Sequence, residues 1–280
     1  MRIFMSVDME GITGVAHGAA LNTDGLDYMR FRKMMTADVN AAVEGAIKAG
    51  VEEVVVGDAH GTMTNILIEE LHDKARLISG SNKTLCQMGG IEDYDFDGVM
   101  FVGYHGGEGS RGVVNHTVMG VAVTQITVNG KWVGETTLNA GVAGHFGLPV
   151  ILVTGDDVVT AEATQNLDHP EIAVVKKAKD RFCADCLPPK RSHELIRESA
   201  FRAVERLKNG EFKPYKVTAP INIEITFKTT PEVTFCSLFP TIQAIGTKTV
   251  RITADDYVTA YKQMWGCLVL GRAAQGGVFK

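Results

Sequence analysis

The sequence predicts an α/β protein: a three-layer domain built on a mostly parallel sheet, followed by a smaller α+β domain. Two patterns favour this class. Short apolar runs alternate with longer segments of helical periodicity over most of the chain, which is typical of βαβ units. After about residue 210, apolar and polar residues alternate singly, as in half-exposed strands. We therefore expect one domain over residues 1–190 and a second over residues 191–280.

The parallel sheet is expected to contain five buried strands, because five short apolar runs are bounded by glycine or charged residues. They cover residues 3–7, 53–56, 75–78, 98–102 and 150–153. The clearest helix covers residues 28–49, where Phe31, Met35 and Val39 fall on one stripe and Gly50 follows at the position of a C-terminal cap. A second helix is expected over residues 192–208, ended by an Asn-Gly pair.

Antiparallel structure interrupts this pattern. Residues 124–135, TQITVNGKWVGE, predict a hairpin, since β-branched residues flank an Asn-Gly turn. Strands are also expected within KVTAPINIEITF and TKTVRITA, and a closing helix over residues 257–270.

Composition excludes several classes of function. The chain is 45% hydrophobic and 22% charged, with a net charge of -5, which gives no electrostatic case for binding nucleic acid or an anionic membrane. It contains no apolar run of about 18 residues and no secretory signal pattern. The cysteines, at positions 86, 183, 186, 236 and 267, are odd in number and scattered, unlike a disulfide framework. We therefore expect a reduced, cytoplasmic protein.

Two acids end the first strand. Asp8 and Glu10 are two residues apart, so in an extended chain they point to one face. Two carboxylates so placed repel one another unless a cation or a shared proton lies between them. The pair is therefore either a solvated strand end or one wall of a cation site.

The ends of other strands favour the cation site. Asp58 and His60 follow the second strand, His105 follows the run GVMFVGY, and Glu135 ends the predicted hairpin. Carboxyl ends of parallel strands meet at one edge of a sheet, where α/β proteins bind ligands. Mixed imidazole and carboxylate ligands suit zinc, and carboxylates can bridge two metal ions.

Two further histidines belong to loops near this edge. His116 lies eleven residues after His105, past a glycine-rich stretch, and is either a general base, a group that polarises the reacting carbonyl, or a surface histidine. His17, in the long aperiodic segment 11–27, is a weaker candidate for the rim.

Other patterns in the sequence are weaker evidence of function. Cys183 and Cys186 have the spacing of a redox pair or half a zinc site, but no second such pair follows. Gly155-Asp156-Asp157, after the strand at 150–153, is expected to cap the next helix at its N-terminus, with a supporting role at the site or at an interface as the alternative. The glycine-rich stretches match neither dinucleotide nor phosphate-loop spacing.

The ordered set of candidate residues resembles the DppA-type zinc D-aminopeptidases. The resemblance rests on SVDMEGITG, Asp58-x-His60, LISG, FVGYH, His116, VGE-x-x-LNA and VTGDD, and runs along almost the whole chain. It implies a cytoplasmic exopeptidase that removes N-terminal D-residues, such as D-Ala, from short peptides. The implied assembly is a homo-oligomeric ring, a homodecamer, with active sites facing an inner channel.

The resemblance also implies roles for individual residues. Asp8 would bridge two zinc ions per subunit, and the remaining ligands would be Glu10, His60, His105 and Glu135. His116 matches the histidine with a catalytic role, and Glu108 is a candidate for holding the substrate's amino terminus. Two other functions stay open at this point: a zinc hydrolase or amidase of different specificity, and a non-catalytic peptide-binding protein linked to peptide uptake.

Overall fold

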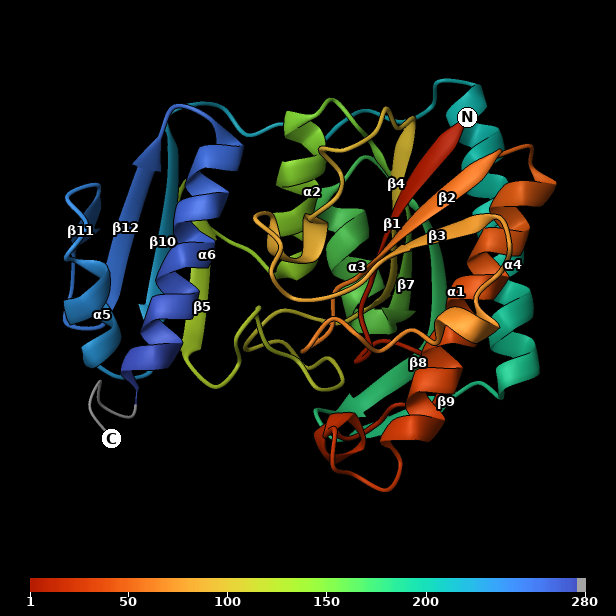
Figure 1. The fold of residues 1–280 in the computed structure, drawn as a ribbon, viewed down its shortest axis with the longest axis horizontal. Coiled ribbons are helices and arrows are strands. Elements are labelled where there is room, and N and C mark those ends of the chain that lie inside the picture. Colours follow the sequence, from red (N-terminus) through yellow and green to blue (C-terminus); the bar gives the residue numbers. More distant parts are fainter. Residues whose placement is uncertain (276–280) are drawn as a thin grey trace.

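The computed structural model describes residues 1–275 of the chain. Its strands form two sheets, against which the helices pack (Figure 1). The larger sheet has seven strands in the order β3-β2-β1-β4-β7-β8-β9, all parallel except the last. Its strands are β1 (Arg2–Val7), β2 (Glu53–Asp58), β3 (Ala75–Ile78), β4 (Gly98–Tyr104), β7 (Val150–Asp156), β8 (Glu171–Asp180) and β9 (Cys183–Cys186). This confirms the predicted class and all five predicted strands.

Helices cover both faces of this sheet, which gives the expected three layers. Helices α1 (Tyr28–Lys48) and α4 (Pro189–Lys208) lie on one face, and α2 (Glu135–His145) and α3 (Asp157–Asn166) lie on the other (Figure 1). The first strand shows why: Ile3 and Met5 pack with α1 and α4, whereas Phe4 packs with the opposite core. The Asp156 carboxylate caps α3, as expected, by accepting from the backbone N–H groups of Val158 and Val159.

The second sheet is antiparallel and has the order β11-β12-β10-β5-β6. Its strands are β5 (Val123–Val128), β6 (Lys131–Trp132), β10 (Ile221–Phe227), β11 (Ile242–Ala244) and β12 (Thr249–Ala254). Asn129 and Gly130 turn between β5 and β6 with positive φ at both positions, which confirms the predicted hairpin. Two helices, α5 (Pro231–Cys236) and α6 (Tyr257–Ala274), complete this half.

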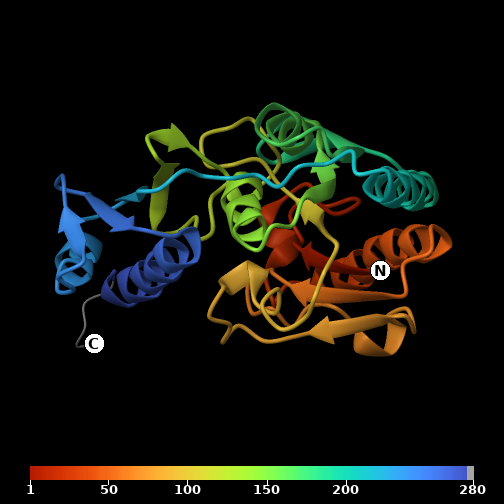
Figure 2. The ribbon, with the colours of Figure 1, turned by 90° about the horizontal axis from the view of Figure 1, so that it is seen from above.

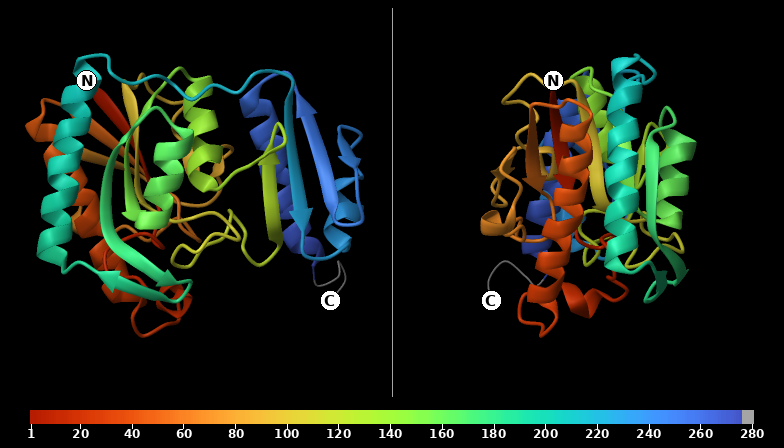
Figure 3. Two further views of the ribbon diagram at one scale, coloured as in Figure 1. Left: turned by 180° about the vertical axis from the view of Figure 1, so that it is seen from behind. Right: turned by 90° about the vertical axis from the view of Figure 1, so that its right-hand side faces the viewer.

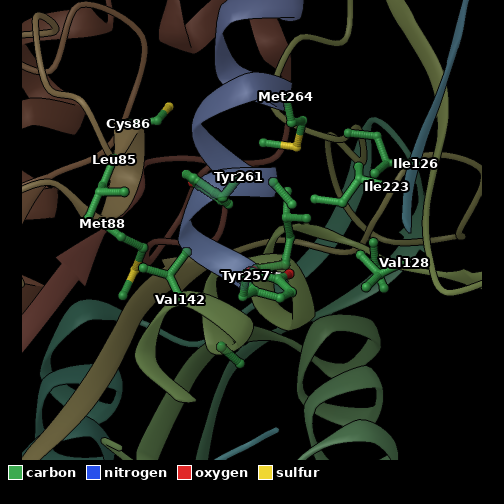
Figure 4. Packing of buried hydrophobic residues seen from close by; sticks show 14 of the residues in the cluster. Leu85, Cys86, Met88, Ile126, Val128, Val142, Ile223, Tyr257, Tyr261 and Met264 are labelled. Carbon is green, nitrogen blue, oxygen red and sulfur yellow. Dashed lines mark hydrogen bonds between the residues drawn. The ribbon is translucent and has the colours of Figure 1, made fainter. Parts of the chain in front are cut away.

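Helix α6 joins the two halves through a shared apolar core. Seen from above, it lies between the second sheet and the rest of the molecule (Figure 2). Tyr261 and Met264 of α6 pack among side chains from both sides, which include Leu85, Met88, Val142, Ile126 and Ile223 (Figure 4). The second half is therefore part of the hydrophobic core that also underlies the larger sheet.

The two sheets are not built from two consecutive parts of the chain. Helix α4 packs beside α1 on the larger sheet, while β5 and β6, from the middle of the sequence, pair with β10 in the smaller one. Residues 209–220 cross from α4 to β10 along one end of the molecule (Figure 3). The proposed domain boundary near residue 190 stays a prediction. In the described residues, no helix is long and apolar enough to cross a membrane.

Candidate metal centre

The carboxyl ends of three neighbouring strands, β2, β1 and β4, carry predicted ligands. Because β1 lies between β2 and β4, the segments that follow these strands place Asp8, His60 and His105 side by side. Gly11 and Gly103 let the chains after β1 and β4 approach closely: a Cβ on Gly11 would lie 1.8 Å from the Tyr104 carbonyl oxygen. Glu135 joins the group as the first residue of α2.

Asp8 faces two histidines with its two carboxylate oxygens. Its Oδ1 lies 3.1 Å from His60 Nδ1, and its Oδ2 lies 3.4 Å from His105 Nε2. His60 Nδ1 also lies 2.9 Å from Glu10 Oε2, and His105 Nε2 lies 3.2 Å from Glu135 Oε1. The cluster thus has two halves that share the Asp8 carboxylate.

In the neutral His105 ring, the nitrogen that carries no hydrogen faces two carboxylates. Its Nδ1 donates to the Gly106 carbonyl at 2.9 Å, so in the neutral ring Nε2 is an acceptor that faces two carboxylates. Acceptors facing acceptors require a cation or a proton between them. Burial alone lowers the pKa of His105, but the charges of Glu135 and Asp8 outweigh burial and hold the pKa well above its usual value.

The other half of the cluster shows the same electrostatics. Burial lowers the pKa of His60, while Glu10 and Asp8 raise it more, so that it lies well above its ordinary value. Among the acids, burial and the neighbouring Glu10 charge raise the pKa of Asp8. The pKa of Glu10 falls well below its usual range, because the facing histidines, His60 above all, outweigh the effect of burial.

His116 lies over the cluster. Its ring stacks on that of His105, with centroids 4.1 Å apart and planes at 10°. Its Nδ1 donates to the Val114 carbonyl at 3.0 Å, while Nε2 lies 3.6 Å from Glu135 Oε1 and 3.9 Å from Glu10 Oε1. Its side chain keeps 19% of its accessible surface, whereas that of His105 is fully buried.

These residues fit zinc. Two buried atoms, Asp8 Oδ2 and His105 Nε2, have no hydrogen-bond partner among the described residues. Ligand atoms about 2.0–2.1 Å from a tetrahedral zinc ion lie roughly 3.3 Å from one another, close to the separations found here. Two donor sets, each within 4.8 Å, have the composition of a metal site: Asp8, Glu10 and His105 form one, and His105, His116 and Glu135 form the other.

Two residues that the sequence did not single out hold this arrangement. Lys176 of β8 is fully buried, and its Nζ donates to the carbonyls of Glu10, Ile12 and Val15, at 2.5, 3.0 and 2.7 Å. Gln87 donates from Nε2 to Glu135 Oε2. The one signal for Lys176 was its place directly after the apolar residues 172–175, and nothing local marked Gln87.

Three other candidate residues belong to neither of these donor sets. The Asp58 carboxylate accepts from the backbone N–H groups of Asn65, Ile66 and His60. His17 is exposed, lies against the Phe182 ring at a tilt of 34° and accepts from the Ala19 N–H. Glu108 Oε2 is buried and unpaired in the described part of the chain.

The Cys183–Cys186 pair does not form a redox or metal unit. Both residues belong to strand β9, where positions three apart point to opposite faces and lie about 10 Å from one another. A disulfide needs Cα atoms within about 7 Å. All five cysteines are free thiols.

The chain is similar to known proteins over almost its whole length. Residues 1–265 match the model of a family described as D-aminopeptidase. A D-aminopeptidase of Bacillus subtilis is 34% identical over 265 residues, which cover 94% of this chain and 95% of that protein. A solved structure, described as the Zn-dependent D-aminopeptidase DppA from Bacillus subtilis, a self-compartmentalizing protease, is similar with a TM-score of 0.92. It is 32% identical, and the match covers 98% of this chain and 99% of that one. The chain therefore belongs to the D-aminopeptidase family and is a peptidase, that is, a hydrolase.

Proposed function

We propose that this chain is a zinc aminopeptidase that removes N-terminal D-residues, such as D-Ala, from short peptides, and that each subunit binds two zinc ions. The observation that carries the proposal is the position of Asp8, whose two oxygens face two different histidines. A carboxylate so placed is suited to bridge two metal ions. The name of the similar structure, a Zn-dependent D-aminopeptidase, supports the choice of metal and substrate.

The two halves of the cluster support one set of ligands for each proposed ion. Asp8 Oδ1, Glu10 and His60 would hold one, and Asp8 Oδ2, His105 and Glu135 the other. Each half would supply three protein ligands, the number that catalytic zinc sites take from the protein. When bound, zinc supplies Lewis acidity, which makes water available as a nucleophile near neutral pH and polarises a carbonyl.

His116 would act on the reacting groups rather than hold the metal. The Val114 carbonyl fixes a hydrogen on Nδ1, so Nε2 is the atom free to react. In the neutral ring Nε2 accepts a proton from the attacking water, and in the charged ring it donates to the developing oxyanion. Its partial exposure, unlike the buried His105, leaves it accessible to a substrate.

An exopeptidase also needs a group for the substrate's free amine. The Glu108 carboxylate supports that role, because one of its oxygens is buried without a partner among residues 1–275. Its backbone N–H donates to Thr117 Oγ1 at 3.0 Å, which ties Glu108 to the loop that carries His116. An ammonium group at that oxygen would supply the missing partner.

We further propose a homo-oligomeric ring, a decamer, in the cytoplasm. An apolar hollow of about 570 Å³ lies on the outer side of α6, lined by Phe239, Trp265, Val269, Leu270 and neighbours. Leu238, Phe239 and Val269 are at least half exposed, which makes this surface suited to a second copy of the chain. The description of the similar protein as self-compartmentalizing supports closure of such contacts into an enclosed assembly. Mass measurement in solution tests it: ten chains support the ring, and a monomer contradicts it.

Turnover of a small substrate panel tests the activity. Zinc-loaded protein is assayed with D-Ala-p-nitroanilide, its L enantiomer and the N-acetylated D compound. Release is expected from the D compound, less from the L compound, and none when the amine is blocked. Release from the blocked compound would indicate an amidase of other specificity. Binding of the D compound without release would indicate a peptide-binding protein.

A further inference from the structure

A buried polar network lies directly behind Glu135 and reaches into the closing helix. Gln87 comes from the short 3-10 helix η3 (Cys86–Met88), Asn139 from α2 and Tyr261 from α6. All three side chains are at least 95% buried. Gln87 Nε2 donates to Glu135 Oε2, Asn139 Nδ2 donates to Gln87 Oε1 at 2.8 Å, and Tyr261 OH donates to Asn139 Oδ1 at 2.8 Å.

The chemistry of the groups fixes the direction of every bond in this chain. An ionised carboxylate only accepts, so Gln87 must present its NH₂ group to Glu135 and its oxygen to Asn139. Asn139 must then present its NH₂ group to Gln87 and its oxygen away from it. Only a donor can meet that oxygen, and the Tyr261 hydroxyl supplies it. The Glu135 carboxylate therefore determines which way both amides are turned, and the hydroxyl on α6 is the last donor that this arrangement needs.

A second branch closes the network. Asn139 Nδ2 also donates to Tyr104 OH at 2.9 Å. Ser6 Oγ lies 2.7 Å from Tyr104 OH and donates to the Gln87 carbonyl at 2.8 Å, so the Tyr104 hydroxyl must donate to Ser6. Both hydrogens of the Asn139 amide and the hydroxyl hydrogens of Ser6, Tyr104 and Tyr261 are thereby used. The branch ties the ends of β1 and β4, which precede Asp8 and His105, to the same Asn139.

We infer that Gln87, Asn139 and Tyr261 form a positioning relay, through which helix α6 sets the orientation of the Glu135 carboxylate. The inference rests on the proposed zinc site. With Oε2 held by Gln87, Glu135 Oε1 faces His105 Nε2 at 3.2 Å and accepts from the Val118 N–H at 2.6 Å. Partners behind metal ligands commonly fix ligand orientation and affinity.

Loss of the Tyr261 hydroxyl would propagate to the site by a definite route. Asn139 Oδ1 would be left buried without a donor, and the amide would lose the bond that holds it from the side of α6. A less firmly held Asn139 weakens the bond that it donates to Gln87 Oε1. Gln87 in turn holds Glu135 Oε2 less firmly. The relay therefore predicts weaker zinc binding from a substitution in a helix that contributes no ligand.

The test compares two tyrosines of the same helix. Tyr261→Phe removes the relay's last donor, while Tyr257→Phe removes a buried hydroxyl that donates to the Leu138 carbonyl, at 2.9 Å, on the same helix α2. Zinc affinity of each full-length variant is measured by competition with a chromophoric chelator. We expect zinc to bind Tyr261→Phe about 3- to 10-fold more weakly, and Gln87→Met about 10- to 100-fold more weakly. Tyr257→Phe should match wild type, and excess zinc should restore kcat to Tyr261→Phe.

Measurements on the two variants distinguish the relay from a general effect of packing. Equal zinc affinity for Tyr261→Phe and Tyr257→Phe overturns the relay, as does an equal loss in both, since that would be a general effect of packing. If wild-type protein itself fails to bind zinc, the proposed metal site is wrong and the relay falls with it. Circular dichroism of the metal-free variants shows whether either substitution unfolds the chain.

Discussion

The imidazole of His116 stacks on that of His105, with ring centroids 4.1 Å apart and planes only 10° from parallel. One ring is fully buried and held by Gly106 through Nδ1, while the other is partly exposed and held by Val114. Both rings present Nε2 to the Glu135 carboxylate. The pair thus divides into an inner ring suited to a metal and an outer ring suited to the substrate.

That division predicts opposite effects of two substitutions. His60→Ala should lose zinc and activity together, because His60 lies between Asp8 and Glu10. His116→Ala should retain zinc and lower kcat by about 10²- to 10⁴-fold, the usual contribution of a proton-transfer group. Metal analysis and steady-state kinetics on the same samples check this. Full activity in His116→Ala would refute its catalytic role, and loss of zinc there would make it a ligand.

Asp8→Asn should affect both proposed ions at once. An amide keeps the shape of the carboxylate but removes the charge that faces His60 and His105. We expect zinc content per chain to fall at both positions and activity to be lost. Glu10→Gln, which alters the carboxylate 2.9 Å from His60, should preferentially weaken one position. If Asp8→Asn loses a single ion and keeps the other at wild-type affinity, Asp8 does not bridge.

Lys176 should matter for both stability and metal binding. Lys176→Met leaves three carbonyls of the Glu10–Val15 segment without their buried donor, at a cost of about 1–3 kcal/mol for each unpaired group. We therefore expect a drop in the free energy of unfolding of roughly 3 kcal/mol or more, together with weaker zinc binding as Glu10 shifts. Urea denaturation and zinc competition measure the two effects.

The neighbouring Lys177 provides the control, because it is exposed on the same strand. Lys177→Met should leave stability and zinc affinity near those of wild type. Wild-type zinc affinity in Lys176→Met, despite reduced stability, would show that the lysine supports the fold but not the site.

Glu162 should make stability depend on pH. Burial raises the pKa of this carboxyl to about 7, against the opposing hydrogen bond from the Gly107 N–H. Between pH 4.5 and 7 the folded chain therefore keeps a proton that the unfolded chain has lost, so this group lowers stability as pH rises through that window.

Glu162→Gln removes the titration and keeps the shape and an acceptor for Gly107. The free energy of unfolding of the variant, relative to that of wild type, should increase from pH 5 to pH 8. Urea denaturation of metal-free protein at both values measures the difference. If the unfolding free energies of the variant and wild type differ by the same amount at pH 5 and pH 8, the pKa of Glu162 is not raised.

Much of the site was predictable, because strand ends are visible in sequence. Apolar runs located β1, β2 and β4, and parallel strands bring their carboxyl ends to one edge. Asp8, His60 and His105 could therefore be grouped without coordinates. Glu135 was found because an Asn-Gly hairpin runs straight into a helical pattern. Residue identity and local periodicity carried all of this information.

What was not predictable depends on tertiary packing. Strand β8 was not expected, because its sequence, EIAVVKKAKD, mixes lysines into an apolar run. Only the neighbouring strand and the loop after β1 make Lys176 a buried donor. Gln87 and Tyr261 meet Asn139 from segments 52 and 122 residues away in sequence, so no local pattern marks them. Membership of β5 and β6 in the second sheet likewise depends on pairing with β10.

The most direct test of the central claim is a titration of zinc into metal-free protein with release of D-Ala from D-Ala-D-Ala as the readout. The two-ion site predicts no release without zinc and an activity that rises until two equivalents per chain are bound and then levels off. Release that is complete in the presence of excess chelator, or no release at two bound equivalents, would contradict the account.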